Sequence, residues 1–254
     1  MTTKFILLGT GSSMGVPRID GFFGDCDPKN IKNYRTRCSA LLVHKNQNIL
    51  IDTSPDLRFQ LLRHKIKSID NVLFSHQHAD QTHGINDLRT FYLKNKKKIP
   101  VYADLKTSNY LKKNFSYCFK KKLDYPAILK LKNIKINNFF KYNIKIKAIP
   151  VKHGLIDCLS FVINNKLAYA SDVNNIYQKD LKNFKNLKYF VVDCLRFNKH
   201  PSHFNLDDVL KLTNIIKPKK TILTNLHTDL DYNHLLKILP KNIKPGFDGL
   251  TLNI

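Results

Sequence analysis

The segment of the sequence with the most potential metal ligands is residues 75–84, which read Ser-His-Gln-His-Ala-Asp-Gln-Thr-His-Gly. His76 and His78 are separated by one residue, so both imidazoles can face one side of an extended segment, and Asp80 follows at the same spacing. Two imidazole nitrogens and one carboxylate oxygen form a ligand set for Zn²⁺, Mn²⁺ or iron rather than for a Cys-rich structural zinc. Two His in this spacing also occur by chance in a chain with ten His, so further ligands are needed.

Further potential ligands follow apolar runs elsewhere in the chain. Six such runs end in His or Asp, namely at Asp52, His76, His153, Asp172, Asp193 and, shortly after residues 221–224, His227. Burial of a strand gives no reason for it to end in these residue types, whereas a metal or acid–base site requires polar side chains on loops held by a rigid scaffold. We therefore expect one edge of a sheet to carry the site.

The elements that would position these residues are short apolar strands and a few helices. The expected strands are 5–8, 40–43, 49–51, 72–74, 144–149, 159–163, 167–170, 189–192 and 221–223. The expected helices are 55–64, 105–113, 175–182 and 206–216, the last with Asn205 as its N-cap. The pattern predicts a mixed α/β (α+β) fold in a single domain over residues 1–254, with residues 94–132 as its least structured stretch.

The composition describes a folded chain with a strongly basic surface. The 254 residues are 43% hydrophobic and 24% charged, which excludes disorder throughout, and the net charge of +24 favours anionic partners. A general bias toward Lys, Asn and Ile would produce the same charge, so the charge alone does not establish nucleic-acid binding. The Lys-rich residues 94–132 are open to two interpretations, a solvated face or a polyanion contact.

Cysteine content and hydropathy favour a cytoplasmic protein. The five Cys are widely spaced and include no Cys-x-x-Cys pair, so neither a disulfide framework nor a zinc ribbon is expected. The apolar run at residues 5–8 is too short for a signal-peptide core, and no stretch approaches the ~20 apolar residues of a membrane span. We expect no membrane partner.

The order of these residues resembles the metallo-β-lactamase superfamily, whose signature is His-x-His-x-Asp-His followed by a distant His, a bridging Asp and a last His. The resemblance extends to the opening Leu-Leu-Gly-Thr-Gly-Ser-Ser with Gly-Val-Pro at 15–17, to residues 50–53 and 171–172, and to Gly-Phe-Asp-Gly at 246–249. These flanks are most similar to the phosphoribosyl 1,2-cyclic phosphate phosphodiesterases and, more remotely, to the tRNA 3′-end processing endonucleases. The resemblance implies a four-layer αβ/βα sandwich, two mixed β-sheets with flanking helices, and a site along one rim.

The resemblance also implies a set of metal ligands. By position, His76, His78 and His153 would hold one metal, and Asp172 would bridge to a second metal that Asp80 also holds. Two such ions would lie ~3.5–4 Å apart and lower the pKa of a shared water toward ~7, which supplies a hydroxide nucleophile at neutral pH.

Two residues depart from the superfamily pattern, and both fall on the second metal. Gln81 stands where the His after the Asp is usual, and Asn225 stands where the last ligand His is expected. His227 lies two residues after Asn225 and would point to the same side if the segment stays extended, so it could replace the missing imidazole. A carboxamide oxygen could also act as a ligand and would favour Mn²⁺ over Zn²⁺. The sequence leaves open whether one ion or two are bound.

Other residues are candidates for catalysis and substrate binding. In the similar phosphodiesterases a His at the position of His203 reaches the phosphate and could protonate the leaving group, so His203 and Asp80 are the catalytic candidates; a His that packs at the helix start is the alternative. Candidates for phosphate contacts are Arg196, Arg89, Ser12 and Ser13. Asp52 and Asp193 are expected to orient ligand imidazoles.

The leading hypothesis is a metal-dependent hydrolase that cleaves a phosphodiester, with a small cyclic phosphate as one candidate substrate, with Zn²⁺ or Mn²⁺ as cofactor and with a homodimer as an open possibility. A tRNA 3′-end processing endoribonuclease would suit the charge, but the sequence has no Gly/Pro-rich arm for gripping tRNA. Lactam, thioester and lactone hydrolysis use the same metal core. A non-catalytic polyanion-binding relative would explain the altered ligands.

The similar phosphodiesterases often carry a structural zinc in a Cys cluster after the Gly-Val-Pro turn. Here that stretch offers only Cys26, with Cys38 twelve residues later. Too few thiolates remain for such a site.

Overall fold

The strands of the protein form two mixed sheets. The computed structural model describes residues 3–135, 137–140 and 143–254, and within them each sheet has seven strands. The first sheet, in the order β14-β1-β2-β3-β4-β5-β6, contains β14 (Thr251–Asn253), β1 (Lys4–Gly9), β2 (Ser39–His44), β3 (Gln47–Ile51), β4 (Asn71–Leu73), β5 (Ile99–Ala103) and β6 (Leu129–Asn133). The second, in the order β13-β12-β11-β10-β9-β8-β7, contains β13 (Ile243–Pro245), β12 (Lys220–Thr224), β11 (Tyr189–Asp193), β10 (Leu167–Ala170), β9 (Ile156–Ile163), β8 (Ile144–His153) and β7 (Asn137–Phe140).

Alternation of side chains along the strands allows the sheets to stack. In β1, Phe5 and Leu7 belong to the apolar cluster between the sheets, whereas Leu8 belongs to the cluster on the outer face of the first sheet. The ring of Phe5 lies 5.5 Å from the ring of Tyr169 in β10, centroid to centroid, so the two inner faces are in contact. The core between the sheets is therefore built from every second residue of strands in both sheets.

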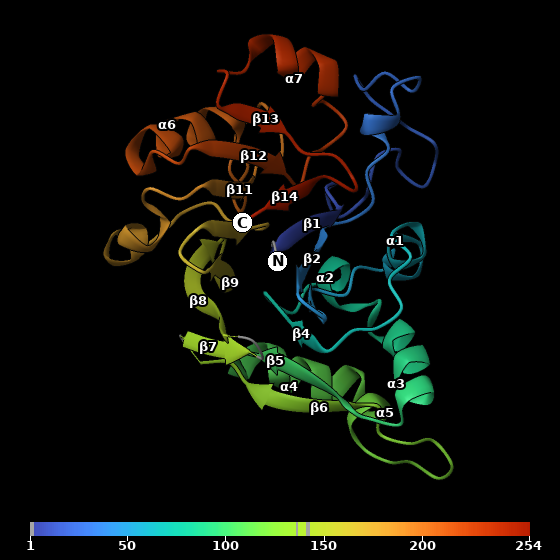
Figure 1. The fold of residues 1–254 in the computed structure, drawn as a ribbon. Helices are drawn as coiled ribbons and strands as arrows, with labels where there is room; N and C mark the ends of the chain where they lie inside the picture. The colour runs from blue at the N-terminus through green and yellow to red at the C-terminus, as the bar shows by residue number, and fades with distance from the viewer. Residues whose placement is uncertain (1–2, 136, 141–142) are drawn as a thin grey trace.

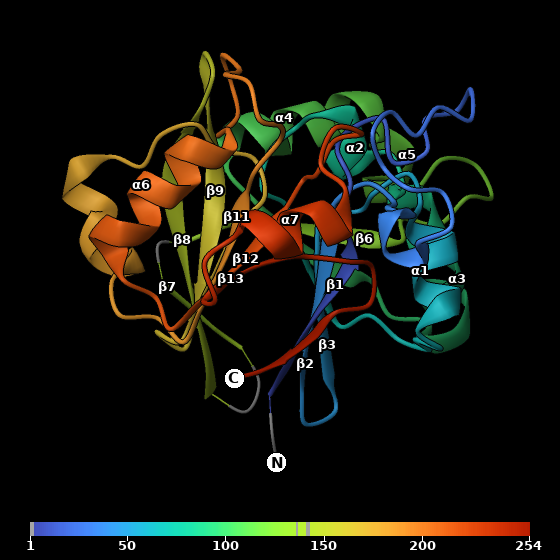
Figure 2. The same ribbon diagram turned by 90° about the horizontal axis from the view of Figure 1, so that it is seen from above.

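Helices cover the outer face of each sheet and complete four layers (Figures 1 and 2). On the first sheet lie α1 (Leu57–Arg63), α2 (Ala79–Thr82), η2 (Ile85–Leu88), α3 (Arg89–Asn95), α4 (Leu105–Asn114) and α5 (Ser116–Phe119). On the second lie η4 (Gln178–Phe184), α6 (Leu206–Ile216) and α7 (Tyr232–Ile238), and a short η1 (Ile31–Asn33) sits in the loop after β1. Helix α6 begins at the predicted N-cap, because the Asn205 side chain accepts the Asp208 N–H, and buries Val209 and Leu212 against the sheet. The expected layered sandwich is confirmed.

Strand direction brings the polar residues after the strands to one edge. Strands β10, β11, β12 and β13 are parallel, as are β3, β4, β5 and β6. The carboxyl ends of parallel strands meet at one edge of a sheet, so the residues that follow them lie together. In the described ranges, no helix is both long and apolar enough to cross a lipid bilayer.

Residues 94–132 are more ordered than the sequence suggests. They contain β5, α4, α5 and β6. Strand β6 was overlooked because Lys alternates with Leu: Leu129 is buried and Lys130 is exposed, the pattern of an edge strand that shields itself with charge. The helix expected at 175–182 is instead the 3-10 segment η4, which starts at Gln178.

Candidate metal centre

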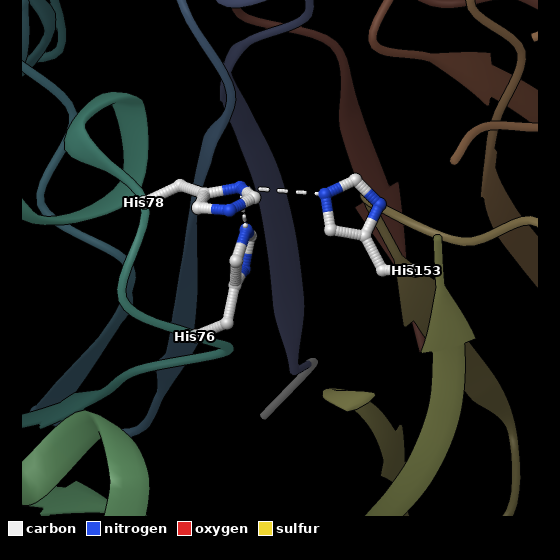
Figure 3. Close-up of side chains that lie close together, drawn as sticks. All are labelled: His76, His78 and His153. Atoms are coloured by element: carbon white, nitrogen blue, oxygen red, sulfur yellow. Dashed lines mark hydrogen bonds between the residues drawn. The ribbon is translucent and has the colours of Figure 1, made fainter. Parts of the chain in front are cut away.

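Three imidazoles from the two sheets converge at one point. His76 follows β4, His78 directly precedes α2, and His153 is the last residue of β8. His76 Nε2 lies 2.9 Å from His78 Nδ1, which lies 3.3 Å from His153 Nε2. Figure 3 shows the three rings directed toward one another across the gap between their elements. Three imidazole nitrogens around one point are typical of a site for a divalent cation.

The outer ring nitrogens of two of these imidazoles are fixed by neighbouring groups. His153 Nδ1 lies 2.7 Å from the carbonyl oxygen of Ser202. Because a carbonyl oxygen only accepts, Nδ1 carries the proton and Nε2 keeps its lone pair. His76 Nδ1 similarly lies 3.0 Å from Ser75 Oγ. Burial lowers the pKa of His76 to about 3 and lowers that of His153, so both are neutral, as metal ligands must be.

Asp172 and His203 lie beside His153 and extend the cluster. The ligand atoms of these three residues lie within 4.8 Å of one another. Asp172 lies two residues after the end of β10 and is buried. Burial alone would raise its pKa, but three surrounding imidazoles outweigh burial and lower it. The carboxylate at this edge is therefore available as an anion.

His203 is held by a buried carboxylate. Its Nδ1 lies 2.6 Å from Asp193 Oδ2, and Asp193 is completely buried at the end of β11. Burial would lower the pKa of His203, but the Asp193 carboxylate reverses this effect and raises the pKa to about 9. His203 is thus a proton donor at neutral pH, and the expectation that Asp193 orients an imidazole is met at this residue.

Two carboxamides lie among the carboxylates. Gln81 Nε2 donates to Asp80 Oδ2 at 3.1 Å and to Asp172 Oδ2 at 3.2 Å. Asn225 Nδ2 donates to Asp193 Oδ1 at 3.2 Å and lies 3.4 Å from Asp172 Oδ1. Both amides are buried, so these hydrogen bonds replace solvent around the carboxylates.

A cavity of about 280 Å³ opens over the cluster. Its lining includes His78, Asp80, His153, Asp172, His203, Ser12, Ser13 and Arg196. Ser12 Oγ is buried and has no hydrogen-bond partner among the described residues, so its hydroxyl is free to bind a ligand. The Arg196 guanidinium donates to the carbonyl oxygens of Asn198 and Lys199, which fixes its position on the wall.

The loop that carries Ser12 is fixed by Asp248 from the Gly-Phe-Asp-Gly motif. The Asp248 carboxylate accepts the backbone N–H and the hydroxyl of both Thr10 and Thr36. Ser12 N–H in turn donates to the carbonyl oxygen of Leu226 at 3.2 Å. The cavity wall is therefore held on both sides by buried polar contacts.

The rim beside this wall is fixed by a buried guanidinium. Arg35 is 2% exposed, and its terminal nitrogens donate to the carbonyl oxygen of Leu230 at 2.7 Å, to Asn33 Oδ1 at 3.0 Å and to the carbonyl oxygen of His227 at 3.3 Å. Cys26 Sγ lies 3.8 Å from the same guanidinium. In the part of the chain that the structure describes, neither cluster of potential metal ligands contains a Cys, and the contacts of Arg35 hold this loop.

Two expectations about polar residues are wrong. Arg89 does not line the cavity; its guanidinium lies over the ring of Tyr125 at 4.6 Å, on an exposed face. Asp52 does not contact a ligand imidazole in the described part of the chain: its Oδ2 has no hydrogen-bond partner there, and its Oδ1 accepts the Ser75 N–H at 2.7 Å and so positions the loop before His76. Strand endings predict that a residue is near the edge, but not which atom it contacts.

His227 lines the cavity without joining either ligand cluster of the described chain. Its Nε2 lies 3.1 Å from Arg18 Nη2. The expectation that it faces the same way as Asn225 fails because Asn225 has φ of 60°, in the left-handed region, which breaks the alternation of an extended segment. His227 therefore does not supply the imidazole that Asn225 lacks.

The sequence analysis does not assign a role to His200, which lines the cavity. His200 lies on the wall, with its ring 5.0 Å from the ring of His203, centroid to centroid. Its Nδ1 lies 3.2 Å from Ser202 Oγ. The spacing of His200 and His203 in one loop was the available signal.

A larger hollow of about 700 Å³ adjoins the cavity, and Met14 lines both. Two carboxylates line this hollow, and both have partners in the protein. Asp56 forms an ion pair with Arg37, and Asp248 accepts hydrogen bonds from Thr10 and Thr36. It therefore contains no set of converging ligands.

Comparison with known proteins identifies the family and the fold. A sequence model of the beta-lactamase superfamily domain matches residues 47–225. The chain is similar to a crystal structure described as a new diphosphatase from the PhnP family, with 30% identity, a TM-score of 0.91, and coverage of 100% of this chain and 98% of that chain. Two further crystal structures share the fold. Zn²⁺-bound PqqB from Methylobacterium extorquens is 15% identical with a TM-score of 0.78, over 99% of this chain and 100% of that chain. The short form of human tRNase Z is 14% identical with a TM-score of 0.71, over 98% of each chain.

A curated relative is an octanoyltransferase of Porphyromonas gingivalis, 32% identical over 254 residues and 97% of this chain. The chain spans about half of that relative's length, 51%.

Proposed function

The chain belongs to the beta-lactamase superfamily, in its PhnP-like branch, and on this premise we propose that it is a metal-dependent phosphodiesterase that acts on a small phosphorylated molecule. The observation that carries the proposal is the convergence of His76, His78 and His153 beside Asp172 and His203. A cation site beside a proton donor supports the proposal, because metal-dependent hydrolysis of a phosphoester uses both.

The donor set fits a divalent transition metal. Two of the three imidazoles are neutral, and the proton of His153 is on Nδ1, away from the shared point. Nitrogen-rich sites suit Zn²⁺, and the neighbouring carboxylates also admit Mn²⁺. When bound, the cation supplies polarisation of a phosphoryl oxygen and a lowered pKa for the attacking water.

The chain's own residues supply binding and proton transfer. His203 carries a proton that Asp193 stabilises, and we assign it the transfer of that proton to the oxygen of the leaving group. Arg196 and the free hydroxyl of Ser12 bind the non-bridging phosphoryl oxygens from the wall of the cavity. His200 lies next to His203 and contributes a further polar contact.

The lining of the cavity supports a small phosphate ester over other substrates. The wall of the cavity carries the Arg196 guanidinium beside the imidazoles of His200 and His227, a set of N–H donors that suits an anion better than a lactam or a lactone. Its volume of about 280 Å³ lies just under the usual ligand range of roughly 300–1,000 Å³, which favours a small molecule over a folded RNA.

The test is hydrolysis of a small cyclic ribose phosphate and of a generic aryl phosphodiester by purified protein, with Zn²⁺ or Mn²⁺ and with chelator. We expect metal-dependent turnover that His78→Ala reduces at least 1,000-fold, an order-of-magnitude figure for loss of a metal ligand together with water activation. His83→Ala is the matched control, because His83 is exposed and contacts Tyr110 and Phe115 outside the cavity. Equal rates for His78→Ala and the parent would refute the proposal.

A further inference from the structure

We propose that this centre holds a single divalent cation, because amide N–H groups of Gln81 and Asn225 occupy the space around its carboxylates in place of a second ion. The inference deepens the proposed function and rests on the same metal site. It concerns the number of ions, which the three imidazoles alone do not determine.

Asp80 and Asp172 form a pair of neighbouring carboxylates that requires compensation. Like charges in a buried setting repel strongly, and proteins compensate them with a cation or with hydrogen-bond donors. Here one amide does so, since Gln81 Nε2 lies 3.1 Å from Asp80 Oδ2 and 3.2 Å from Asp172 Oδ2. An –NH₂ group has two hydrogens, so Gln81 can donate one to each carboxylate.

The other oxygen of Asp172 also faces an amide. Asn225 Nδ2 lies 3.4 Å from Asp172 Oδ1, 3.2 Å from Asp193 Oδ1 and 3.0 Å from the carbonyl oxygen of Ser171. These three acceptors fix the amide with its nitrogen toward the carboxylates. A cation cannot share this position with N–H hydrogens, because both would compete for the same oxygen lone pairs.

The two ligand clusters of the described chain do not amount to two sites. One comprises His76, His78 and His153, and the other comprises His153, Asp172 and His203. Both clusters include His153. Its Nδ1 donates to the carbonyl oxygen of Ser202, so only Nε2 offers a lone pair to a cation. One lone pair binds one ion, so the clusters are parts of a single centre.

In the described part of the chain, no imidazole beyond those of the two clusters converges on Asp80 and Asp172. In the described ranges Asp80 belongs to neither cluster, and the imidazole of His227 is turned to the Arg18 guanidinium at 3.1 Å. A cation bound by Asp80 and Asp172 alone would have two protein ligands, and it would have to displace the amides of Gln81 and Asn225 from these carboxylates. The structure therefore favours one ion per chain.

The experiment counts ions in metal-saturated protein after dialysis, by elemental analysis and by calorimetric titration of metal-free protein with Zn²⁺ and Mn²⁺. The parent is expected to bind one ion, and Gln81→His/Asn225→His is expected to bind two, because two imidazoles then replace two amides beside Asp80 and Asp172. Gln178→His, at the start of η4 and outside the cavity, is the control and should still bind one.

Two ions in the parent, or one ion in the folded double variant, would overturn the inference. If the double variant does not fold, electron paramagnetic resonance of the Mn²⁺-loaded parent decides: the resolved hyperfine pattern of an isolated ion supports one site, and a spin-coupled spectrum overturns it. A parent that binds two ions and hydrolyses phosphodiesters would sink this inference alone, whereas a parent that binds no metal would also sink the proposed function.

Discussion

Replacing Arg35 with Met should destabilise the protein far more than replacing its near neighbour Arg37. Arg35 is 2% exposed and donates to Leu230 O, Asn33 Oδ1 and His227 O. Arg35→Met removes three charge-assisted hydrogen bonds, at about 1.5–3 kcal/mol each, and this loss is partly offset because a charge no longer has to be buried. Leu230 O loses its donor, whereas Asn33 Oδ1 keeps the Tyr232 N–H and His227 O keeps the Leu230 N–H. The expected net loss is about 3 kcal/mol, or roughly 6–12 °C in Tm for a chain of this size.

Arg37→Met is the matched comparison, because Arg37 forms a paired contact with Asp56 whose side chains are 31% and 23% exposed. A partly solvated pair contributes at most about 1 kcal/mol. Urea unfolding followed by circular dichroism gives both free energies of unfolding, and equal slopes in urea confirm that the same transition is measured. A loss for Arg35→Met no larger than that for Arg37→Met would show that the guanidinium does not brace the rim.

Three further predictions concern the centre itself. Asp193→Asn should lower kcat about 30-fold at pH 8 and less than about 2-fold at pH 6, because the pKa of His203 falls from about 9 toward 6.5 and its proton is then lost as the pH rises. A pH–rate profile measures this, and a pH-independent ratio would contradict it. Chelation should abolish activity and lower the free energy of unfolding by about 3 kcal/mol while the far-ultraviolet circular dichroism is retained, and Zn²⁺ or Mn²⁺ should restore both activity and stability. Complete unfolding on chelation would contradict this expectation. Ser12→Ala should raise KM several-fold with a change in unfolding free energy under about 0.5 kcal/mol, since no protein hydrogen bond is lost, and an unchanged KM would remove Ser12 from substrate binding.

The mixed α/β fold and the edge that carries the site were predictable from sequence. Apolar runs predict the strands, the His and Asp residues at their ends indicate the edge, and the family resemblance implies the layered arrangement. The sequence pattern does not predict β5, β6, β7, β13 and β14. Strand β5 contains Pro100, β6 alternates Leu with Lys, β13 contains Pro245, and β7 and β14 have only four and three residues. Their pairing depends on neighbours that are distant in sequence, so local patterns carry little of the information.

The site was predictable to the level of residue type but not of atomic contact. His76, His78, His153 and Asp172 meet as the resemblance implies. The role of His227 was not predictable, because a single left-handed residue redirects the chain after β12. The amide contacts also escaped sequence analysis, since side-chain spacing does not specify which end of an amide faces a carboxylate.

The ligands of the centre come from opposite halves of the sandwich. His76 and His78 follow β4 of one sheet, whereas His153 is the last residue of β8 in the other sheet and Asp172 follows β10 of that sheet. A bound ion would add a further link between the two halves, beside the apolar core and hydrogen bonds such as those from Gln81 to Asp172 and from Ser12 to Leu226. Any fluctuation that parts the sheets at this edge must also release the ion, so an ion at 100 times its dissociation constant opposes such opening by about 2.7 kcal/mol. Occupancy of the centre is thereby linked to the mechanical integrity of the whole sandwich.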